Sequence, residues 1–488
     1  MKDIPDIPKV MSTQHPDNVH LPFFAENSLL GGEDEVQEAY YIYSHLGCRE
    51  QMWDCEGKEV DNFVVKKLLS KYGSFFSEKH LGRDIFLTLR VPNPEVEKAE
   101  AKILLETLES IPRSYDVANL FYGEDIPPIF EVILPMTSSH ISIDNIYQYY
   151  RDFVVGQQYK RLGGRDLTIA QWIGSFKPER INVIPLFEDM ESMLNAHNIV
   201  RRYLEDKDSW YQRVFLARSD PAINYGLLSA VLLNKISLKR LYDLSVETKI
   251  PIYPIIGVGS APFRGNLRPD NVEKIAAEYP SVYTFTIQSA FKYDYPLDEV
   301  RKGVAALETR TVLPPHDIDE KRSLEFIKKY THEYREQIIP LSDIINRVSG
   351  YIPGRRRRKL HIGLFGYSRS MNGLKLPRAI TLTAALYSVG VPPEILGISA
   401  LDERDLEFIR ENYVNFDDDL RDALRYLNPD SEFLPEDLLR KASDMVDFEI
   451  NEEHKEITDR ILFSLRENCT ADLEAEILRA ANVRKFLG

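Results

Sequence analysis

Two acidic side chains are the first candidates for chemistry in this chain. Glu188 ends the apolar run INVIPLFE (181–188), and Asp220 directly follows the next such run, RVFLARS (213–219). If the two runs are neighbouring strands, their axes lie about 5 Å apart and both carboxylates can hold one cation. No cluster of histidine or cysteine accompanies them, which favours a hard ion that keeps its waters, Mg²⁺ or Mn²⁺.

A structural alternative exists for the same stretches. Asp220 precedes Pro221, an order typical of a helix N-cap followed by the first helical residue. Asp189 precedes MESML and could cap a helix in the same way. Residue types and spacing leave metal binding and capping both open.

Two glycine-containing segments carry arginines that could bind an oxyanion. In GVGSAPFRGN (257–266), the glycines Gly257, Gly259 and Gly265 and the guanidinium of Arg264 could close over an anionic group. In GLFGYSRSMNGLKLPRAI (363–380), Arg369 and Arg378 flank a glycine-rich turn. The alternatives are a purely structural loop and surface arginines that pair with acidic helices.

Two further segments place charges beside predicted strand ends. Arg90 ends the strand-like stretch in TLRVPNP, where it is either a salt-bridge anchor or a ligand clamp. In MWDCEGKEVD, Asp54, Glu56 and Lys58 follow another such stretch, and we expect them to orient other polar groups rather than to touch a substrate.

Each of these residues lies at or just after the carboxyl end of a predicted strand. Short β-branched or aromatic runs alternate with segments of helical periodicity, which predicts a parallel sheet with crossover helices. Eight such runs predict an α/β fold of the (β/α)8 TIM-barrel type, in which active-site residues follow the carboxyl ends of the strands. The runs are 50–54, 84–91, 129–136, 181–188, 213–219, 250–257, 282–288 and 359–366.

Helices are expected to extend this barrel in two places. Amphipathic spacing predicts helices inserted at about 290–350, before the last strand, and a C-terminal helical extension over 401–488. Residues 1–400 then form the catalytic domain. The run GRRRRK (354–359) precedes the predicted eighth strand, so we expect it at the opposite, non-catalytic end of the barrel.

Composition excludes several classes of protein. The 488 residues carry a formal charge of -15, which disfavours a nucleic-acid or anionic-membrane partner. The three cysteines, Cys48, Cys55 and Cys469, form neither a disulfide nor a zinc pattern and indicate a reducing compartment, so we expect a cytoplasmic protein. No apolar run approaches the roughly 18 residues of a membrane span, and the N-terminus lacks the apolar core of a signal peptide.

An ordered set of motifs resembles one enzyme family. STQHPDN, MWDCEGKEVD, TLRVPNP, PLFED, ARSDPAINYG, GVGSAPFRGN and GYSRSMNGLKLPRAI occur in this order over residues 9 to 400. Together they resemble phosphoenolpyruvate carboxylase of the short archaeal type. The resemblance implies that phosphoenolpyruvate and bicarbonate react to give oxaloacetate and phosphate, through carboxyphosphate and an enolate. It also implies a homotetramer.

The resemblance assigns a role to each candidate residue. The catalytic histidine of the family's T-A-H-P-T-E motif corresponds to His15, and the metal ligands correspond to Glu188 and Asp220. Four arginines correspond to arginines of the family's motifs: Arg90, Arg264, Arg369 and Arg378. The family's longer members have a lysine where Ile223 stands and an arginine where Val258 stands, so those two roles must be distributed differently. The remaining alternative is a Mg²⁺-dependent C–C lyase that acts on a 2-oxo acid in a similar barrel.

Overall fold

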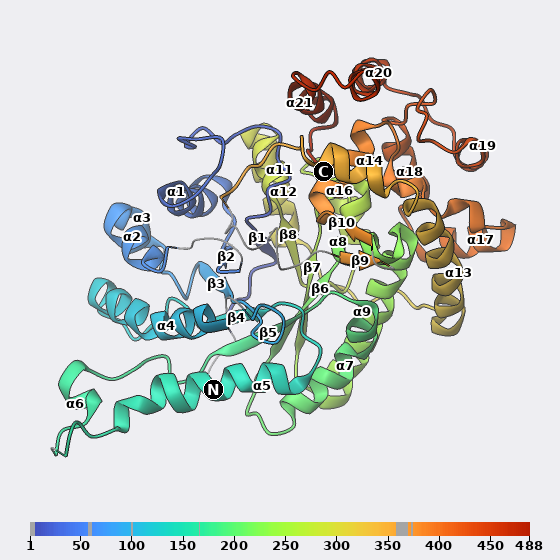
Figure 1. Cartoon of the computed structure of the whole chain (residues 1–488). Coiled ribbons are helices and arrows are strands. Elements are labelled where there is room, and N and C mark those ends of the chain that lie inside the picture. The colour runs from blue at the N-terminus through green and yellow to red at the C-terminus, as the bar shows by residue number, and fades with distance from the viewer. Residues whose placement is uncertain (1–4, 57–60, 99–100, 165, 358–368, 372–373) are drawn as a thin grey trace.

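A closed parallel barrel forms the centre of the molecule. The structure is a computed structural model that describes residues 5–56, 61–98, 101–164, 166–357, 369–371 and 374–488. Strands pair in the order β1 to β8, and β8 pairs back to β1 (Figure 1). These strands are β1 (Val10–Ser12), β2 (Glu50–Asp54), β3 (Phe86–Arg90), β4 (Glu131–Leu134), β5 (Asn182–Phe187), β6 (Gln212–Ala217), β7 (Ile252–Gly257) and β8 (Thr284–Ile287).

The predicted fold class is confirmed, with one correction to the strand assignment. Seven predicted runs coincide with β2 to β8, but the remaining barrel strand is the N-terminal β1. The run 359–366, predicted as the eighth strand, lies outside the described residues. Since the barrel closes between β8 and β1, the helices predicted at about 290–350 follow the last barrel strand instead of preceding it.

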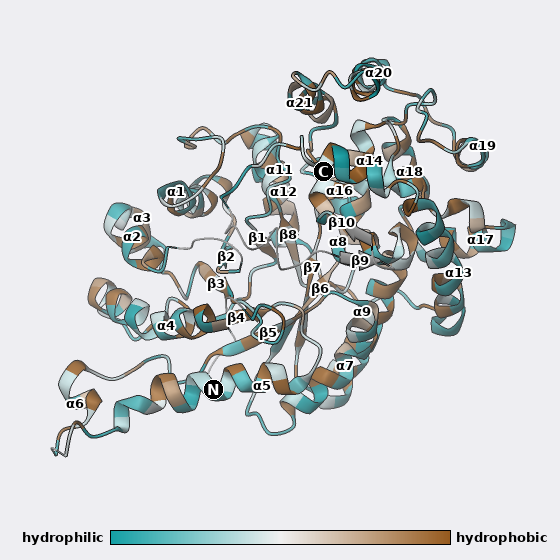
Figure 2. Ribbon diagram, viewed as in Figure 1, coloured by the Kyte–Doolittle hydropathy of each residue, from teal (hydrophilic) through white to brown (hydrophobic). Residues whose placement is uncertain are grey.

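Helices cover the outside of the barrel between consecutive strands. Figure 2 shows them as mixed brown and teal along their length, as expected for helices with one face towards a core. Those up to β8 are α1 (Glu33–Tyr41), α2 (Val64–Lys71), α3 (Gly73–Glu78), α4 (Ala101–Tyr122), α5 (His140–Gln148), α6 (Ile169–Ile173), α7 (Met190–Leu204), α8 (Ser219–Tyr225), α9 (Leu227–Thr248) and α10 (Val272–Glu278), with the π-helices η1 (Ile42–Leu46) and η2 (Tyr149–Val155) and the 3-10 helices η3 (Gly156–Tyr159) and η4 (Pro262–Arg264).

The helices after β8 pack against one side of the barrel and include the C-terminal extension (Figure 1, yellow to red). They are α11 (Ser289–Tyr293), α12 (Leu297–Thr309), α13 (Glu320–Ile338), α14 (Ser342–Ser349), α16 (Ala379–Ser388), η5 (Pro393–Ile395), η6 (Ile398–Ala400), α17 (Glu403–Asn412), α18 (Phe416–Leu424), α19 (Glu436–Met445), α20 (Glu452–Arg466) and α21 (Leu473–Arg484). The short hairpin β9 (Arg369–Met371) and β10 (Leu374–Leu376) lies between α14 and α16.

Side-chain alternation divides the barrel interior into layers. Successive residues of a strand point to opposite faces, so every second residue points inward. A middle layer of buried apolar side chains fills the barrel, and consists of Met11, Met52, Ile133, Ile184, Leu186, Phe215, Ala217 and Ile255. By the same alternation, Arg90 and Asp54 belong to the layer at the carboxyl ends of the strands.

A buried ionic cluster forms the floor of the barrel. The Arg213 guanidinium lies 2.7 Å from Glu50 and 2.8 Å from Glu131, and all three side chains are buried. Thr88 donates a hydrogen bond of 2.5 Å to Glu50. Burial raises the pKa of Glu131, although the charge of Arg213 opposes that rise. The two carboxylates therefore depend on a single arginine.

We expect Arg213→Met to destabilise the fold strongly. The substitution leaves Glu50 and Glu131 buried without their cation, a situation that costs about 3–5 kcal/mol. The control is Lys239→Met, which removes an exposed i,i+4 pair with Asp243 and should cost under about 1 kcal/mol. Urea unfolding of both variants measures the difference, and equal unfolding midpoints would show that the cluster carries no such energy.

Candidate active site

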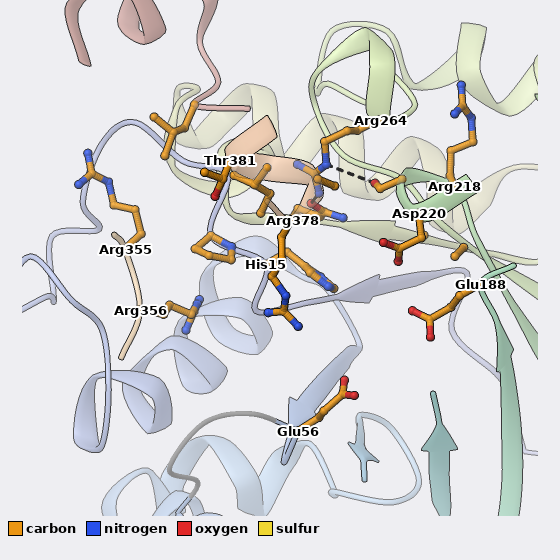
Figure 3. A pocket seen from close by; sticks show the side chains of 18 of the residues that line it. His15, Glu56, Glu188, Arg218, Asp220, Arg264, Arg355, Arg356, Arg378 and Thr381 are labelled. Atoms are coloured by element: carbon orange, nitrogen blue, oxygen red, sulfur yellow. Dashed lines mark hydrogen bonds between the residues drawn. The ribbon is translucent and has the colours of Figure 1, made fainter. Parts of the chain in front are cut away.

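A cavity of about 380 Å³ opens at the carboxyl ends of the barrel strands. It brings together seven of the predicted site residues: His15, Arg90, Glu188, Asp220, Gly257, Arg264 and Arg378. Figure 3 shows Glu188 and Asp220 to one side of His15, and Arg355 and Arg356 to the other. Residues that lie hundreds of positions apart in the sequence therefore meet in one cavity, some predicted from strand ends and His15 from the family resemblance.

Glu188 and Asp220 lie next to each other on one wall of the cavity (Figure 3). Glu188 follows β5, and its carboxylate accepts a hydrogen bond of 2.7 Å from the backbone N–H of Met136. Asp220 lies in the first turn of α8, where a negative charge is favourable. The N-cap of α8 is Arg218 and not Asp220, so the capping alternative for Asp220 is wrong. The capping prediction for Asp189 is confirmed, since its carboxylate accepts from Ser192 N–H at 2.9 Å.

Arg90 is fixed in the wall by acidic neighbours. Asp54 accepts two hydrogen bonds from its guanidinium, at 2.8 Å and 2.7 Å, and Glu56 lies 3.3 Å from Nε. Burial raises the pKa of Glu56 to about 7, although Arg90 opposes that rise. Arg378 also acts on Glu56 through its charge, and burial lowers the pKa of Arg378 itself. Lys58, the third charge predicted in this segment, lies outside the described residues.

The N-terminal polar segment forms another part of the wall. It continues β1 beyond Ser12, and the carbonyl of His15 accepts from Ser289 N–H at 3.2 Å. The Gln14 side chain accepts from Asp54 N–H at 3.1 Å, which ties this segment to the strand that carries Asp54. His15 Nδ1 lies 2.8 Å from the hydroxyl of Thr13. The histidine is thus held by both its backbone and its ring.

The glycine loop after β7 wraps around Arg264. The Arg264 side chain is buried and lies 3.3 Å from Asp17, and it donates to Ser219 at 3.2 Å and to the Gly488 carbonyl at 2.6 Å. Gly259 and Gly265, predicted as substrate-binding, are not among the described residues that line the cavity. Both glycines are needed for the conformation of the loop. A Cβ on Gly259 would lie only 2.9 Å from the Arg264 guanidinium carbon, and Gly265 has a φ of +119°, which favours glycine.

The prediction that the arginine run at 354–359 lies at the non-catalytic end of the barrel is wrong. Arg355 and Arg356 line the cavity, at the catalytic end of the barrel. Arg356 pairs with Glu38 at 2.6 Å, and Arg355 donates to the carbonyls of Asn18 and Val19 at 3.2 Å and 2.9 Å. The error came from treating 359–366 as a barrel strand, because a run that precedes a strand starts at the other end of the barrel.

Other residues divide into those that sequence reasoning missed and those that the structure does not place. Arg218, Ser219 and Thr381 line the cavity without having been predicted. The first two directly precede Asp220, so the strand-end rule could have found them. Arg369 begins β9, but its side chain lies outside the described part of the chain.

Among the described residues, no group of three or more His, Cys, Asp and Glu side chains is placed to hold a metal ion, so a metal site there would have at most two such ligands. Among the same residues no single helix is long and apolar enough to cross a membrane. One pair of helical segments, Ala379–Ser388 and Pro393–Ala400, has the length and composition of a span but is bent by 98°.

Comparison with known proteins places this cavity in a family. The family described as "Phosphoenolpyruvate carboxylase" matches residues 7–488. The chain belongs to the phosphoenolpyruvate carboxylase family. Relatives of that name come from Methanospirillum hungatei, with 63% identity over 99% of this chain and 100% of the relative, and from Methanothermobacter thermautotrophicus, with 60% identity over the same shares. A phosphoenolpyruvate carboxylase of Pyrococcus abyssi is 51% identical over 99% of this chain and 100% of its own length.

The barrel fold is identified from the pairing of its eight strands, and not from a similar solved structure. Among solved structures, an HpcH/HpaI aldolase from Desulfitobacterium hafniense matches with a TM-score of 0.31 and 12% identity, covering 58% of this chain and 86% of the aldolase.

We expect Glu56→Gln to stabilise the protein more at pH 8 than at pH 5. Folding raises the pKa of this carboxyl group to about 7, so its ionisation destabilises the folded state increasingly as pH rises from the unfolded pKa through about 7. Removing the group therefore increases the free energy of unfolding most at high pH. The control is Glu26→Gln at an exposed position. Free energies of unfolding at the two pH values measure the effect, and a pH-independent difference would contradict a raised pKa.

Proposed function

We propose that this chain is a carboxy-lyase that carboxylates phosphoenolpyruvate with bicarbonate, giving oxaloacetate and phosphate. The observation that carries the proposal is one cavity holding a carboxylate pair, three arginines and a histidine in the family's motif positions: Glu188, Asp220, Arg90, Arg264, Arg378 and His15. The family match over residues 7–488 supports the same reaction. A C–C lyase is not favoured, because the relatives named above carry the carboxylase name.

The carboxylate pair fits a divalent cation that keeps several waters. Glu188 and Asp220 offer hard oxygen donors on one wall of the cavity, and the Met136 N–H orients Glu188. Mg²⁺ is commonly bound by one or two carboxylates together with substrate oxygens, which matches this donor set, and Mn²⁺ accepts the same ligands. When bound, the ion would supply positive charge beside the enolate oxygen and the phosphoryl group.

The arginines would act on the transferring phosphoryl group. Negative charge moves to the phosphoryl and enolate oxygens when bicarbonate attacks phosphorus, and guanidinium groups match this geometry. Asp54 fixes one edge of Arg90 before any substrate binds, so little reorganisation is needed during the reaction. Arg369 has the same proposed role, from its motif position.

His15 would then act as the base for the second step. Carboxyphosphate releases CO₂ only after its carboxyl group loses a proton, and an imidazole has an unperturbed pKa near 6.5, suited to that transfer. The loop around Arg264 would exclude water from the enolate while it waits for CO₂. Asp17 connects the two elements, because it belongs to the His15 segment and pairs with Arg264.

The proposed assembly is supported by the family resemblance and by exposed apolar surface. We propose a homotetramer in the cytoplasm, with residues 1–400 as the catalytic domain and 401–488 as a helical extension. Helix α6 projects from the barrel (Figure 1), and Trp172 and Ile173 on it are 65% and 55% exposed. A contact between subunits would remove such side chains from water.

The first test measures oxaloacetate by a coupled assay with and without bicarbonate and Mg²⁺. We expect turnover only when both are present, and we expect Glu188→Gln and Asp220→Asn to abolish turnover while the protein stays folded, because each weakens Mg²⁺ binding. The control Asp189→Ala removes only the cap of α7, at a cost of about 1 kcal/mol of stability. Near-normal turnover of the first two variants at low Mg²⁺ would exclude them as ligands.

The second test separates the two chemical steps with His15→Asn. We expect bicarbonate-dependent release of phosphate and pyruvate with little oxaloacetate, because the first step depends on the arginines and the carboxylate pair whereas the second depends on the imidazole. His20→Asn is the matched control, since His20 belongs to the same segment but bonds to Asp294 at 3.0 Å. A parallel loss of phosphate and oxaloacetate with a lower melting temperature would make His15 a structural residue.

A further inference from the structure

A buried hydroxyl contacts the ring of His15. Thr13 Oγ1 lies 2.8 Å from Nδ1 of His15, and Thr13 is fully buried below the cavity that His15 lines. The two residues are two positions apart on a chain that continues strand β1, so both side chains point to the barrel interior. Since Nδ1 faces Thr13, Nε2 is the other ring nitrogen of a side chain that lines the cavity.

Thr13 is itself fixed by the barrel. Its N–H donates to the carbonyl of Ile287 on β8 at 3.0 Å, which extends the strand pairing by one residue. Its carbonyl accepts from the Lys292 ammonium at 2.8 Å. The Lys292 side chain is fully buried and pairs with Glu38 at 3.1 Å. The hydroxyl of Thr13 therefore has a position set by β8, α11 and α1, independently of any substrate.

The hydroxyl can decide which ring nitrogen carries the proton. A neutral imidazole has one N–H, and the nitrogen without it is the base. If Thr13 Oγ1 accepts from Nδ1–H, the lone pair is on Nε2, which is the nitrogen needed at the cavity. When Nε2 takes a proton the ring becomes a cation, and the bond from Nδ1–H to the hydroxyl is strengthened by the charge.

We propose that Thr13 is the positioning residue of His15, accepting Nδ1–H so that Nε2 acts as the base. This inference rests on the proposed carboxylation. In that step the O–H bond of the carboxyphosphate carboxyl group breaks and an N–H bond forms at Nε2. The bond from carbon to the bridging oxygen then breaks with its electron pair on phosphate, CO₂ leaves, and phosphate takes the proton back from Nε2.

Three variants test the proposal. Thr13→Val keeps the shape of the side chain and removes the hydroxyl, whereas Thr13→Ser keeps the hydroxyl. Ser12→Ala is the matched control: it also removes a buried hydroxyl, which accepts from Lys292 at 3.1 Å and is not on the ring. We expect Thr13→Val to lower the ratio of oxaloacetate to phosphate about tenfold, the effect of one hydrogen bond to a charged group. Thr13→Ser and Ser12→Ala should retain the ratio.

The pH profile gives a second readout that loss of stability alone would not move. The charged groups that line the cavity with His15 are unchanged in all three variants, and they are Glu56, Arg90, Glu188, Arg218, Asp220, Arg264, Arg355, Arg356 and Arg378. A hydroxyl that accepts from Nδ1–H stabilises the protonated ring relative to the neutral ring, so its removal favours the neutral ring. We expect the acid limb of kcat in Thr13→Val to move to lower pH by about one unit, the equivalent of that tenfold change.

Nitrogen NMR of ¹⁵N-histidine-labelled protein observes the ring without turnover, with the His15 signals assigned through His15→Asn. We expect the proton on Nδ1 in the wild type and in Thr13→Ser, and a shift towards Nε2 in Thr13→Val. Wild-type ring signals together with a wild-type product ratio in Thr13→Val would overturn the proposal, as would a Thr13→Ser variant as impaired as Thr13→Val. If the ring signals behave as expected but the wild type forms no oxaloacetate, the proposed function is overturned while the hold of Thr13 on the ring is supported.

Discussion

The closure of the barrel by its shortest strand is the constraint on which the site depends. Strand β1 has three residues, yet it pairs with β2 on one side and with β8 on the other. Because all strands are parallel, the residues that follow β1 emerge at the same end as those that follow β5 and β6. His15 therefore meets Glu188 and Asp220 in one cavity. If β1 were not in the barrel, neither the position of Thr13 nor the direction of His15 would be determined.

Two buried ionic clusters stabilise this arrangement at different levels. The floor cluster around Arg213 ties β2, β4 and β6 together beneath the apolar layer. The second cluster joins Glu38, Lys292 and Arg356 beside the N-terminal segment. Burial opposes the ionisation of Glu38, but the two cations outweigh that effect and lower its pKa. Breaking a buried pair of this kind is strongly unfavourable, so each cluster favours a single arrangement of its elements.

Much of the fold and part of the site were predictable from local pattern. Seven strands were recognisable because each is a buried run of apolar residues of the length that strands adopt, and Glu188, Asp220 and Arg90 were recognisable because they end such runs. Strand β1 was missed because a segment of three residues is too short to show the hydrophobic periodicity of a strand. That omission shifted the assumed last strand to 359–366 and, through it, placed Arg355 and Arg356 at the wrong end.

By itself, the sequence determined the fold class, the strand ends at which polar residues gather, and the motif set that marks the family, because these depend on the order and spacing of neighbouring residues. Only the tertiary structure decided which strand closes the barrel, that Arg355 and Arg356 line the cavity, that Asp17 pairs with Arg264, and that Thr13 contacts the ring of His15. Apart from the last, these are contacts between distant segments, and even the Thr13 contact needs a backbone direction that β8 imposes. Pairing across the barrel depends on the geometry of closure, which no local pattern contains.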